Sequence, residues 1–259
     1  MEQQQQEPTQ QDENQLESRL PCGVSVEVAN ALRRVIINET PCYAAAAVHS
    51  LTYTADMPLE VLAERLALVP IAFPNTDLVQ ALKQYATGTA EMQENATLTF
   101  QLKAECKDID DCDAKVLYKE LLTRHLTWMP NESQNTLDEC SRPRVVHQSI
   151  PLVQLRPGQA VDLVIKCVPG TGNKHAKWSV ACPATYRYLT PHPLDSQQPN
   201  PQFGLHGDGR QDQKCIEELV NDPDDAIIFS LETTGAVPAK NTVLTALTIL
   251  KQQLSQYVS

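Results

Sequence analysis

Apolar residues recur at helical spacing near both ends of the chain. The N-terminal stripe has a possible cap at Ser25 and ends before Pro41. The C-terminal stripe begins after Pro238 with apolar positions spaced 4, 3, 4 and 3 residues apart, and Leu244 widens it on one side. We therefore predict an amphipathic helix at each end of the chain. The stripe residues are Val24, Val28, Ala31, Leu32, Val35 and Ile36 in the first helix, and Val243, Leu247, Leu250, Leu254 and Tyr257 in the second.

Between these helices the pattern favours strands. Alternation over 48–54 predicts a strand with Val48, Leu51 and Tyr53 facing a core. Further strands are predicted over 97–104, 149–155, 160–168, 184–189 and 226–232. Pro157-Gly158 predicts a tight turn that joins 149–155 to 160–168 as a hairpin.

Two more helices and several polar loops complete the middle of the chain. The helices are predicted over 58–68, where Pro58 fits the first turn, and over 77–85. Loops are predicted over 107–113, 131–143 and 191–213, and the pattern leaves the type of 116–126 open.

Each apolar stripe needs a surface to cover, which sets the expected architecture. The simplest arrangement folds the two chain ends together into one layer and makes the middle an inserted domain. Residues 1–15 contain seven Gln and no apolar side chain after Met1, so we predict a disordered tail there. The expected fold class is α+β with an inserted β-rich domain.

The charge balance restricts the functional classes. Against 32 Asp and Glu there are 21 Lys and Arg, giving a formal net charge of −11. Such a chain is not expected to grip DNA itself, nor to act as a free DNA-binding regulator. No apolar run approaches the roughly 18 residues that a membrane-spanning helix needs. Met1–Pro8 lacks the basic and apolar regions of a secretory signal, so we expect an intracellular protein without a membrane span.

Eight cysteines are scattered through the sequence, and none forms a Cys-x-x-Cys pair. We expect them to be reduced and half-buried. The acidic residues of 108–113 lack the glycine and the closing glutamate of a calcium loop, which favours a solvated loop.

Lys174-His175-Ala176-Lys177-Trp178 is the densest group of chemically versatile side chains. Its preceding glycines are one residue apart, which is too close for a Walker A loop. No carboxylate lies nearby in sequence to orient His175, so we favour a protein-contact loop with Trp178 as a buried anchor. The rival hypothesis is a stand-alone enzyme that uses His175 with Cys167 or Cys182 as base and nucleophile.

Arg33 and Arg34 lie beside the first apolar stripe. They either form a solvated flank or reach the carboxylates of a partner, for which the guanidinium fork is suited.

Five blocks of the sequence, in order, resemble the α-like subunits of cellular RNA polymerases. This group includes the bacterial α subunit, its archaeal counterpart, the third-largest subunit of RNA polymerase II and the larger α-like subunit of polymerases I and III. Val28–Pro41, with its Asn-Ala-Leu-Arg-Arg core, is similar to the signature helix of the family. The other blocks are Asp56–Ile71, Leu155–Gln159, Gly172–Ser179 and Phe229–Gly235 with the helix that follows.

The resemblance implies a discontinuous dimerisation domain, with two amphipathic helices on a small antiparallel sheet, formed by 16–50 and 184–259. A β-rich domain over 51–183 would be inserted into it. The implied function is a non-catalytic assembly subunit of a DNA-dependent RNA polymerase. It would pair with a smaller α-like subunit and form the platform for the two large catalytic subunits.

The resemblance also implies two groups of interface residues. The smaller α-like subunit would contact Val28, Ala31, Leu32, Val35, Val243, Leu247, Leu250 and Leu254. The second-largest polymerase subunit, with small polymerase subunits nearby, would contact Asn30, Arg33, Arg34, Arg65, Lys174, His175 and Trp178.

The chain departs from the family in the stretch from about Asn75 to Asn95. Some relatives have a cysteine cluster there that binds zinc or an iron–sulfur cluster, whereas this stretch has no cysteine. We therefore expect no metal and no cofactor. A weakly recognisable first strand at Leu16–Pro21 suggests a divergent member. The expected location is the nucleus of a eukaryote, or the virion or cytoplasmic factory of a large DNA virus.

Overall fold

The computed structural model describes residues 14–21, 24–74, 76–107, 118–188 and 227–258. Most of the expected tail, the acidic loop and the 191–213 loop lie outside these residues. The described part of the tail includes Gln15, which begins a strand.

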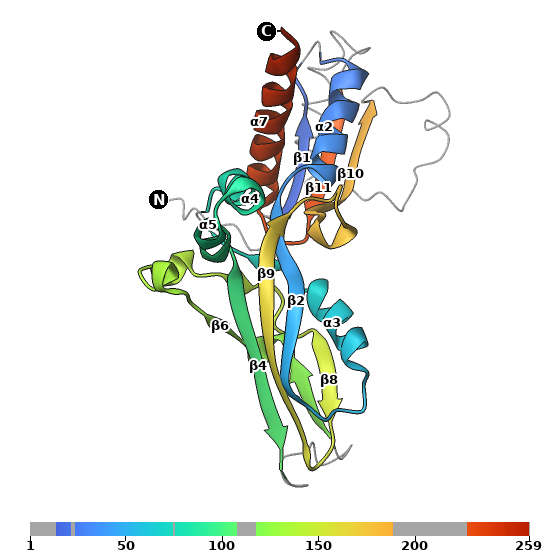
Figure 1. The fold of residues 1–259 in the computed structure, drawn as a ribbon. Coiled ribbons are helices and arrows are strands. Elements are labelled where there is room, and N and C mark those ends of the chain that lie inside the picture. The colour runs from blue at the N-terminus through green and yellow to red at the C-terminus, as the bar shows by residue number, and fades with distance from the viewer. Residues whose placement is uncertain (1–13, 22–23, 75, 108–117, 189–226, 259) are drawn as a thin grey trace, which may run out of the picture.

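The two chain ends form one layer, as the apolar stripes predict. Strands β1 (Gln15–Arg19), β10 (Ala181–Tyr188) and β11 (Ile227–Thr233) make an antiparallel sheet in the order β1-β11-β10. Helices α2 (Val26–Asn38) and α7 (Ala239–Val258) lie side by side against this sheet (Figure 1). Their apolar side chains pack with Phe229 and Leu231 into one hydrophobic cluster.

The middle of the chain forms a larger sheet with the strand order β6-β4-β9-β2-β3-β7. Its strands are β2 (Cys42–Tyr53), β3 (Ile71–Ala72), β4 (Leu98–Cys106), β6 (Leu126–Met129), β7 (Arg144–Val145) and β9 (Gln159–Gly170). Long antiparallel pairing of β2 with β9 runs from Cys42 opposite Gly170 to Tyr53 opposite Val161. Figure 1 shows this ribbon leading from the helical layer toward the opposite end of the molecule.

A second hydrophobic cluster fills the inner side of the six-stranded sheet. Helix α3 (Leu59–Ala67) contributes buried Leu62 and Leu66. A two-stranded sheet of β5 (Lys119–Leu122) and β8 (Pro151–Leu155) contributes Leu121 and Val153.

Short helices connect these elements. Helix α4 (Leu78–Thr87) begins at an Asp77 cap, and α5 (Ala90–Asn95) follows it. The 3-10 helices are η2 (Thr123–His125), η3 (Glu132–Gln134), η4 (Glu139–Ser141) and η5 (Ala176–Trp178). Among the described residues, no helix is long and apolar enough to cross a membrane.

Two strand predictions are wrong. Strands β8 and β9 do not form a hairpin, because β8 pairs with β5 while β9 pairs with β2 and β4. The turn between them does exist, with Gly158 at a φ of 83°. Leu51 is 66% exposed instead of facing the core, since the register of β2 shifts between Ser50 and Thr52.

Candidate subunit interfaces

Large aliphatic side chains are exposed on the α2–α7 layer. Helix α2 buries Leu32, Val35 and Ile36 against the three-stranded sheet. The first turn of α2 exposes Val28 by 48%, while α7 exposes Leu244 by 54%, Leu247 by 44% and Leu254 by 57%. We call these four side chains the aliphatic ridge. Exposed aliphatic side chains on two helices that pack together are typical of a surface that another protein covers.

The eight residues expected to contact the smaller partner differ in how exposed they are. Val28, Leu247 and Leu254 belong to the ridge, and Ala31, Val243 and Leu250 are half-buried. Leu32 and Val35 are each only 4% exposed and belong to the internal cluster. The structure therefore does not support direct contact of Leu32 and Val35 with the smaller partner. The centre of the stripe covers the chain's own sheet, and only its margin remains exposed.

The two arginines on α2 also differ in exposure. Arg33 is half-buried, and its Nε and Nη2 donate to Asn30 Oδ1 at 3.2 and 3.0 Å. Arg34 is exposed. Asn30 thus holds the guanidinium of Arg33 one helical turn away, and Arg34 extends into solvent.

Trp178 anchors the loop between β9 and β10 inside the protein. It is 4% exposed, and its Nε1 donates to Val168 O at 3.1 Å. Lys177 lies 4.4 Å from the ring centroid and its Nζ donates to Ala45 O at 2.8 Å. The anchor prediction agrees with this burial, whereas direct contact of Trp178 with a large subunit does not. Lys174 and His175 are exposed on the same loop.

This loop closes against the C-terminal end of α2. Asn173 N donates to Asn38 O at 2.8 Å, and Ser179 Oγ donates to Ile37 O at 3.3 Å. A Cβ atom at Gly172 would lie 2.2 Å from Ile37 O, so only glycine allows this approach. The loop thereby satisfies the last carbonyl groups of the helix. It also fixes Lys174 and His175 relative to α2.

The electrostatics of the loop do not favour a Cys–His enzyme. Burial raises the pKa of Cys167 to about 12, which holds the thiol protonated at neutral pH. Burial and the neighbouring Lys174 lower the pKa of Lys177. His175 Nδ1 accepts a hydrogen bond from Lys177 N, which occupies that ring nitrogen. In the described part of the chain, no three His, Cys, Asp or Glu side chains are grouped to hold a metal ion.

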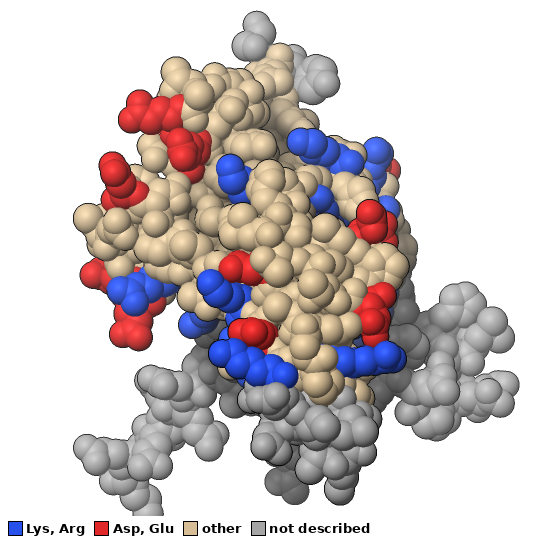
Figure 2. Space-filling view, turned by 60° about the horizontal axis from the view of Figure 1, so that its bottom comes forward, with Lys and Arg blue, Asp and Glu red and all other residues tan. Residues whose placement is uncertain are grey.

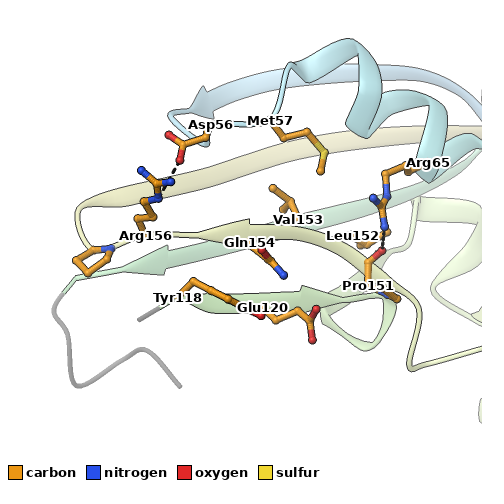
Figure 3. Close-up of a pocket in the computed structure, with 11 residues that line it drawn as sticks. Asp56, Met57, Arg65, Tyr118, Glu120, Pro151, Leu152, Val153, Gln154 and Arg156 are labelled. Atoms are coloured by element: carbon orange, nitrogen blue, oxygen red, sulfur yellow. Dashed lines mark hydrogen bonds and ion pairs between the residues drawn. The ribbon is translucent and has the colours of Figure 1, made fainter. Parts of the chain in front are cut away.

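A groove of about 920 Å³ lies between α3 and the two-stranded sheet. Arg65, expected at a large subunit, lies at one end and donates through Nη2 to Pro151 O (Figure 3). Met57, Leu152 and Val153 supply apolar lining.

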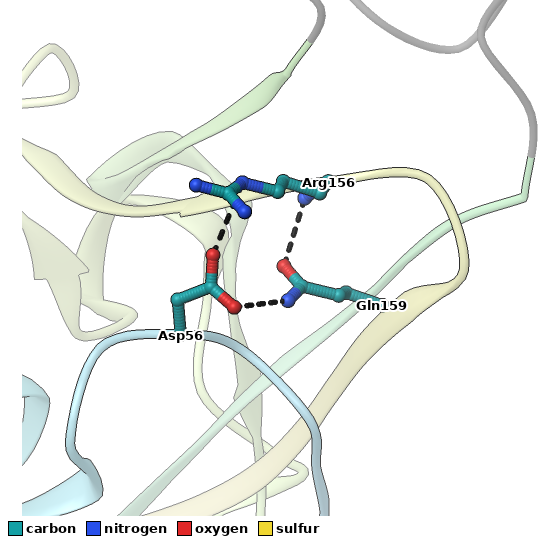
Figure 4. A network of polar contacts seen from close by, with 3 residues as sticks. All are labelled: Asp56, Arg156 and Gln159. Atoms are coloured by element: carbon teal, nitrogen blue, oxygen red, sulfur yellow. Dashed lines mark hydrogen bonds and ion pairs between the residues drawn. The ribbon is translucent and has the colours of Figure 1, made fainter.

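A polar network closes the other end of the groove (Figure 4). Arg156 Nε lies 3.1 Å from Asp56 Oδ2, and Gln159 Nε2 donates to Asp56 Oδ1 at 2.8 Å. Gln159 Oε1 in turn accepts from Arg156 N at 2.8 Å. The sequence did not reveal this network. The sequence feature that could have indicated it is Arg156-Pro157-Gly158-Gln159, because the Pro-Gly turn brings the polar side chains on either side of it close together.

Charges of both signs are interspersed over the face shown in Figure 2, instead of forming one continuous basic area. Ion pairs of Lys103, Lys107, Arg156 and Arg187 are all at least partly exposed. Exposed pairs of this kind contribute little to stability.

Comparison with known proteins identifies the family. The model of the family described as RNA polymerase Rpb3/Rpb11 dimerisation domain matches residues 22–254. A Dictyostelium discoideum protein, DNA-directed RNA polymerases I and III subunit rpac1, is 30% identical over 249 residues, covering 84% of this chain and 70% of that protein.

Two further relatives extend the comparison. Human DNA-directed RNA polymerases I and III subunit RPAC1 is 37% identical over 185 residues, 69% of this chain. Arabidopsis thaliana DNA-directed RNA polymerases II, IV and V subunit 3 is 28% identical over 267 residues, covering 88% of this chain and 82% of that protein. The alignment spans about half (52%) of the human relative. The match of the dimerisation-domain model to most of the chain confirms the resemblance read from its sequence blocks: this chain belongs to the RNA polymerase Rpb3/Rpb11 dimerisation-domain family and is an α-like RNA polymerase subunit.

Proposed function

We propose that this chain is a non-catalytic assembly subunit of a multisubunit DNA-dependent RNA polymerase. It pairs with a smaller α-like subunit, and the pair is the platform for the two large catalytic subunits. The observation that carries the proposal is the exposed aliphatic ridge on α2 and α7, within the region matched by the dimerisation family.

The proposed domain organisation is a dimerisation domain of 16–50 and 184–259 with 51–183 inserted. The three-stranded sheet, which uses strands from both chain ends, supports this division. Both boundaries fall inside strands, β2 and β10, so the inserted domain would be joined to the dimerisation domain through continuous backbone in these strands.

Pairing with the smaller subunit would bury the aliphatic ridge, flanked by half-buried Ala31, Val243 and Leu250. Obligate interfaces bury on the order of 2,000 Å² or more, so the partner would cover much of the outer side of both helices. Leu32 and Val35 act indirectly, because they hold α2 against its sheet.

The second-largest subunit would contact a separate set of polar side chains. Arg33, oriented by Asn30, and exposed Arg34 would meet carboxylates, and exposed Arg65, Lys174 and His175 would extend the contact. Trp178 would support Lys174 and His175 from inside. Small polymerase subunits are further proposed partners.

We place the protein in the nucleus. The relatives named above come from a slime mould, a human and a plant, which supports a eukaryotic setting and gives no support to the viral options.

Co-expression with the smaller α-like subunit of the same organism tests the proposal. The wild-type chain should co-purify with that subunit as a heterodimer. Leu247→Asp should abolish the pairing, because the complex would bury an unpaired charge. Leu51→Asp is the matched control, since Leu51 is also exposed but lies on β2, away from the ridge. Separate monomers in the wild-type sample, or equal loss in both variants, would contradict the proposal.

A further inference from the structure

Lysine side chains interrupt the aliphatic ridge on α7. Exposed residues recur there at intervals of 4, 3, 4 and 3, namely Lys240, Leu244, Leu247, Lys251 and Leu254. Residues at this spacing lie along one side of an α-helix, as in the seam through which one helix packs on another. Lys251 is about one turn from both Leu247 and Leu254, so a partner that covers these two leucines also covers Lys251.

Helix α7 offers these lysines no counterion. It contains no aspartate or glutamate between Ala239 and Val258, so lysines are its only charged side chains. Among the described residues, no carboxylate forms an ion pair with Lys240 or Lys251.

The carboxylates of the neighbouring helix α2 already have hydrogen-bond donors. Hydrogen bonds from the Ser25 side chain and from its own backbone hold the pKa of Glu27 below its usual value. Glu39, the C-cap, accepts a hydrogen bond from Gln253 Nε2 on α7. The ridge therefore keeps an uncompensated positive charge at Lys251.

Covering the ridge would remove Lys251 from water. The four-carbon stem of lysine packs well beside leucines, but a desolvated ammonium group without a counterion costs free energy. A single lysine in an otherwise apolar helix seam restricts both partner and register for this reason. The partner that fits is one that places a carboxylate against Lys251, since a charge-assisted hydrogen bond offsets the desolvation.

We propose that Lys251 determines which partner the ridge accepts: the smaller α-like subunit presents a carboxylate opposite Lys251, and a second copy of this chain does not. The inference rests on the proposed pairing with that subunit and names the chemistry of the contact. In a homodimer formed through the same ridge, α7 of each copy would bring only lysines as charged side chains, and these repel one another.

The test measures binding of the full chain to the smaller α-like subunit of the same organism by isothermal titration calorimetry. Lys251→Met removes the charge and should weaken the pairing by about tenfold, whereas Lys251→Glu should weaken it by about a hundredfold, because reversal adds repulsion. Lys251→Arg keeps the charge and should stay within about threefold of the wild type. Lys166→Glu is the control, since it reverses an exposed charge on β9, and it should leave the affinity unchanged.

A second measurement tests the rejection of a second copy. In sedimentation velocity, the wild-type chain alone should remain monomeric at concentrations at which it pairs with the smaller subunit. Lys251→Leu should form dimers at about tenfold lower concentration than the wild type, because it makes the ridge continuous. Self-association of the wild type as tight as its pairing, or no gain in Lys251→Leu, would overturn the inference.

Charge exchange identifies the partner's carboxylate. One change of an acidic residue to lysine in the smaller subunit should restore the pairing of Lys251→Glu, and failure of every such change would count against the contact. If the wild type pairs and both Lys251→Met and Lys251→Glu pair equally well, this inference fails while the proposed function stands. If the wild type does not pair at all, both fail.

Discussion

At the scale of single residues, two thiols lie deep in the ribbon of β2 and β9. Cys42 and Cys167 are buried, and burial raises the pKa of each to about 12. Cys140 and Cys182 are exposed. Because the thiolate is the reactive form, both burial and protonation protect the first pair.

We expect alkylation of the folded protein with iodoacetamide at pH 8 to modify Cys140 and Cys182, and to leave Cys42, Cys106 and Cys167 unmodified. Peptide mass spectrometry before and after unfolding in urea measures this pattern. Labelling of Cys167 as fast as Cys182 in the folded protein would show that β9 opens readily.

The same pKa shifts predict an alkaline loss of stability. The pKa of Cys167 is raised from 9.0 in the unfolded chain to about 12 in the folded protein. The stability that comes from keeping this thiol protonated is fully present below pH 9, and it is lost as the pH rises to about 12. The free energy of unfolding of the wild type, relative to Cys167→Ala, should therefore decrease between pH 8 and pH 11. Urea titrations at the two pH values measure it, and a constant difference would argue against the shift.

Gln134 is a buried polar residue that joins two segments. Its Nε2 donates to Asn95 O at 3.2 Å and to Thr97 O at 3.1 Å. Gln134→Met should lower the free energy of unfolding by about 1–3 kcal/mol, because it removes the donor that the part-buried carbonyl groups of Asn95 and Thr97 share. Gln80→Met, at an exposed position on α4, is the control and should change stability little. Urea denaturation compares the two.

At the scale of elements, helix α4 begins with a complete cap. Asp77 Oδ1 accepts from the backbone N of Val79 and of Gln80, both at 3.1 Å. Asp77→Ala should cost about 1 kcal/mol of stability, and Asp77→Asn should cost much less, because asparagine keeps the acceptor. Thermal unfolding followed by circular dichroism distinguishes them; equal losses would mean that the carboxylate charge matters more than the hydrogen bond.

The elements also show what the sequence could predict. Helices α2, α3 and α7 were predictable, because each has an apolar stripe with the helical period and a proline near its start or end. The first half of β2 was not predictable as a strand, since Ala44, Ala45 and their alanine neighbours show no alternation of apolar and polar residues. The pairing of β8 with β5 was also hidden, because strand partners distant in sequence leave no local pattern.

For the candidate interface residues, the structure tests only which of them are exposed. Val28, Arg34 and Leu247, which the family blocks assign to interfaces, are exposed in the structure, and their interface roles stay predictions. The family blocks could not show that Leu32 and Trp178 are internal, because an apolar residue looks the same whether its own sheet or a partner covers it.

At the scale of the whole molecule, the two tryptophans report on different regions. Trp128 packs against the cluster of the six-stranded sheet, and Trp178 belongs to the cluster where β2 begins. The continuous β2–β9 pairing links these regions. The Trp128→Phe protein keeps only Trp178 as its tryptophan, and the Trp178→Phe protein keeps only Trp128. Within each protein, we expect tryptophan fluorescence and circular dichroism to give the same urea midpoint. Midpoints that differ between probes in either protein would show that the regions unfold separately.

The long pairing of β2 with β9 has a consequence during synthesis. Strand β2 leaves the ribosome more than a hundred residues before β9, and β1 precedes its partner β11 by over two hundred. At about 5–20 residues per second, β2 waits on the order of ten seconds without its central neighbour. During that time its row of unpaired backbone groups, beside the apolar stripe of α2, is open to pairing with other nascent chains. The yield of this subunit in cells should therefore depend on chaperones that shield its N-terminal third.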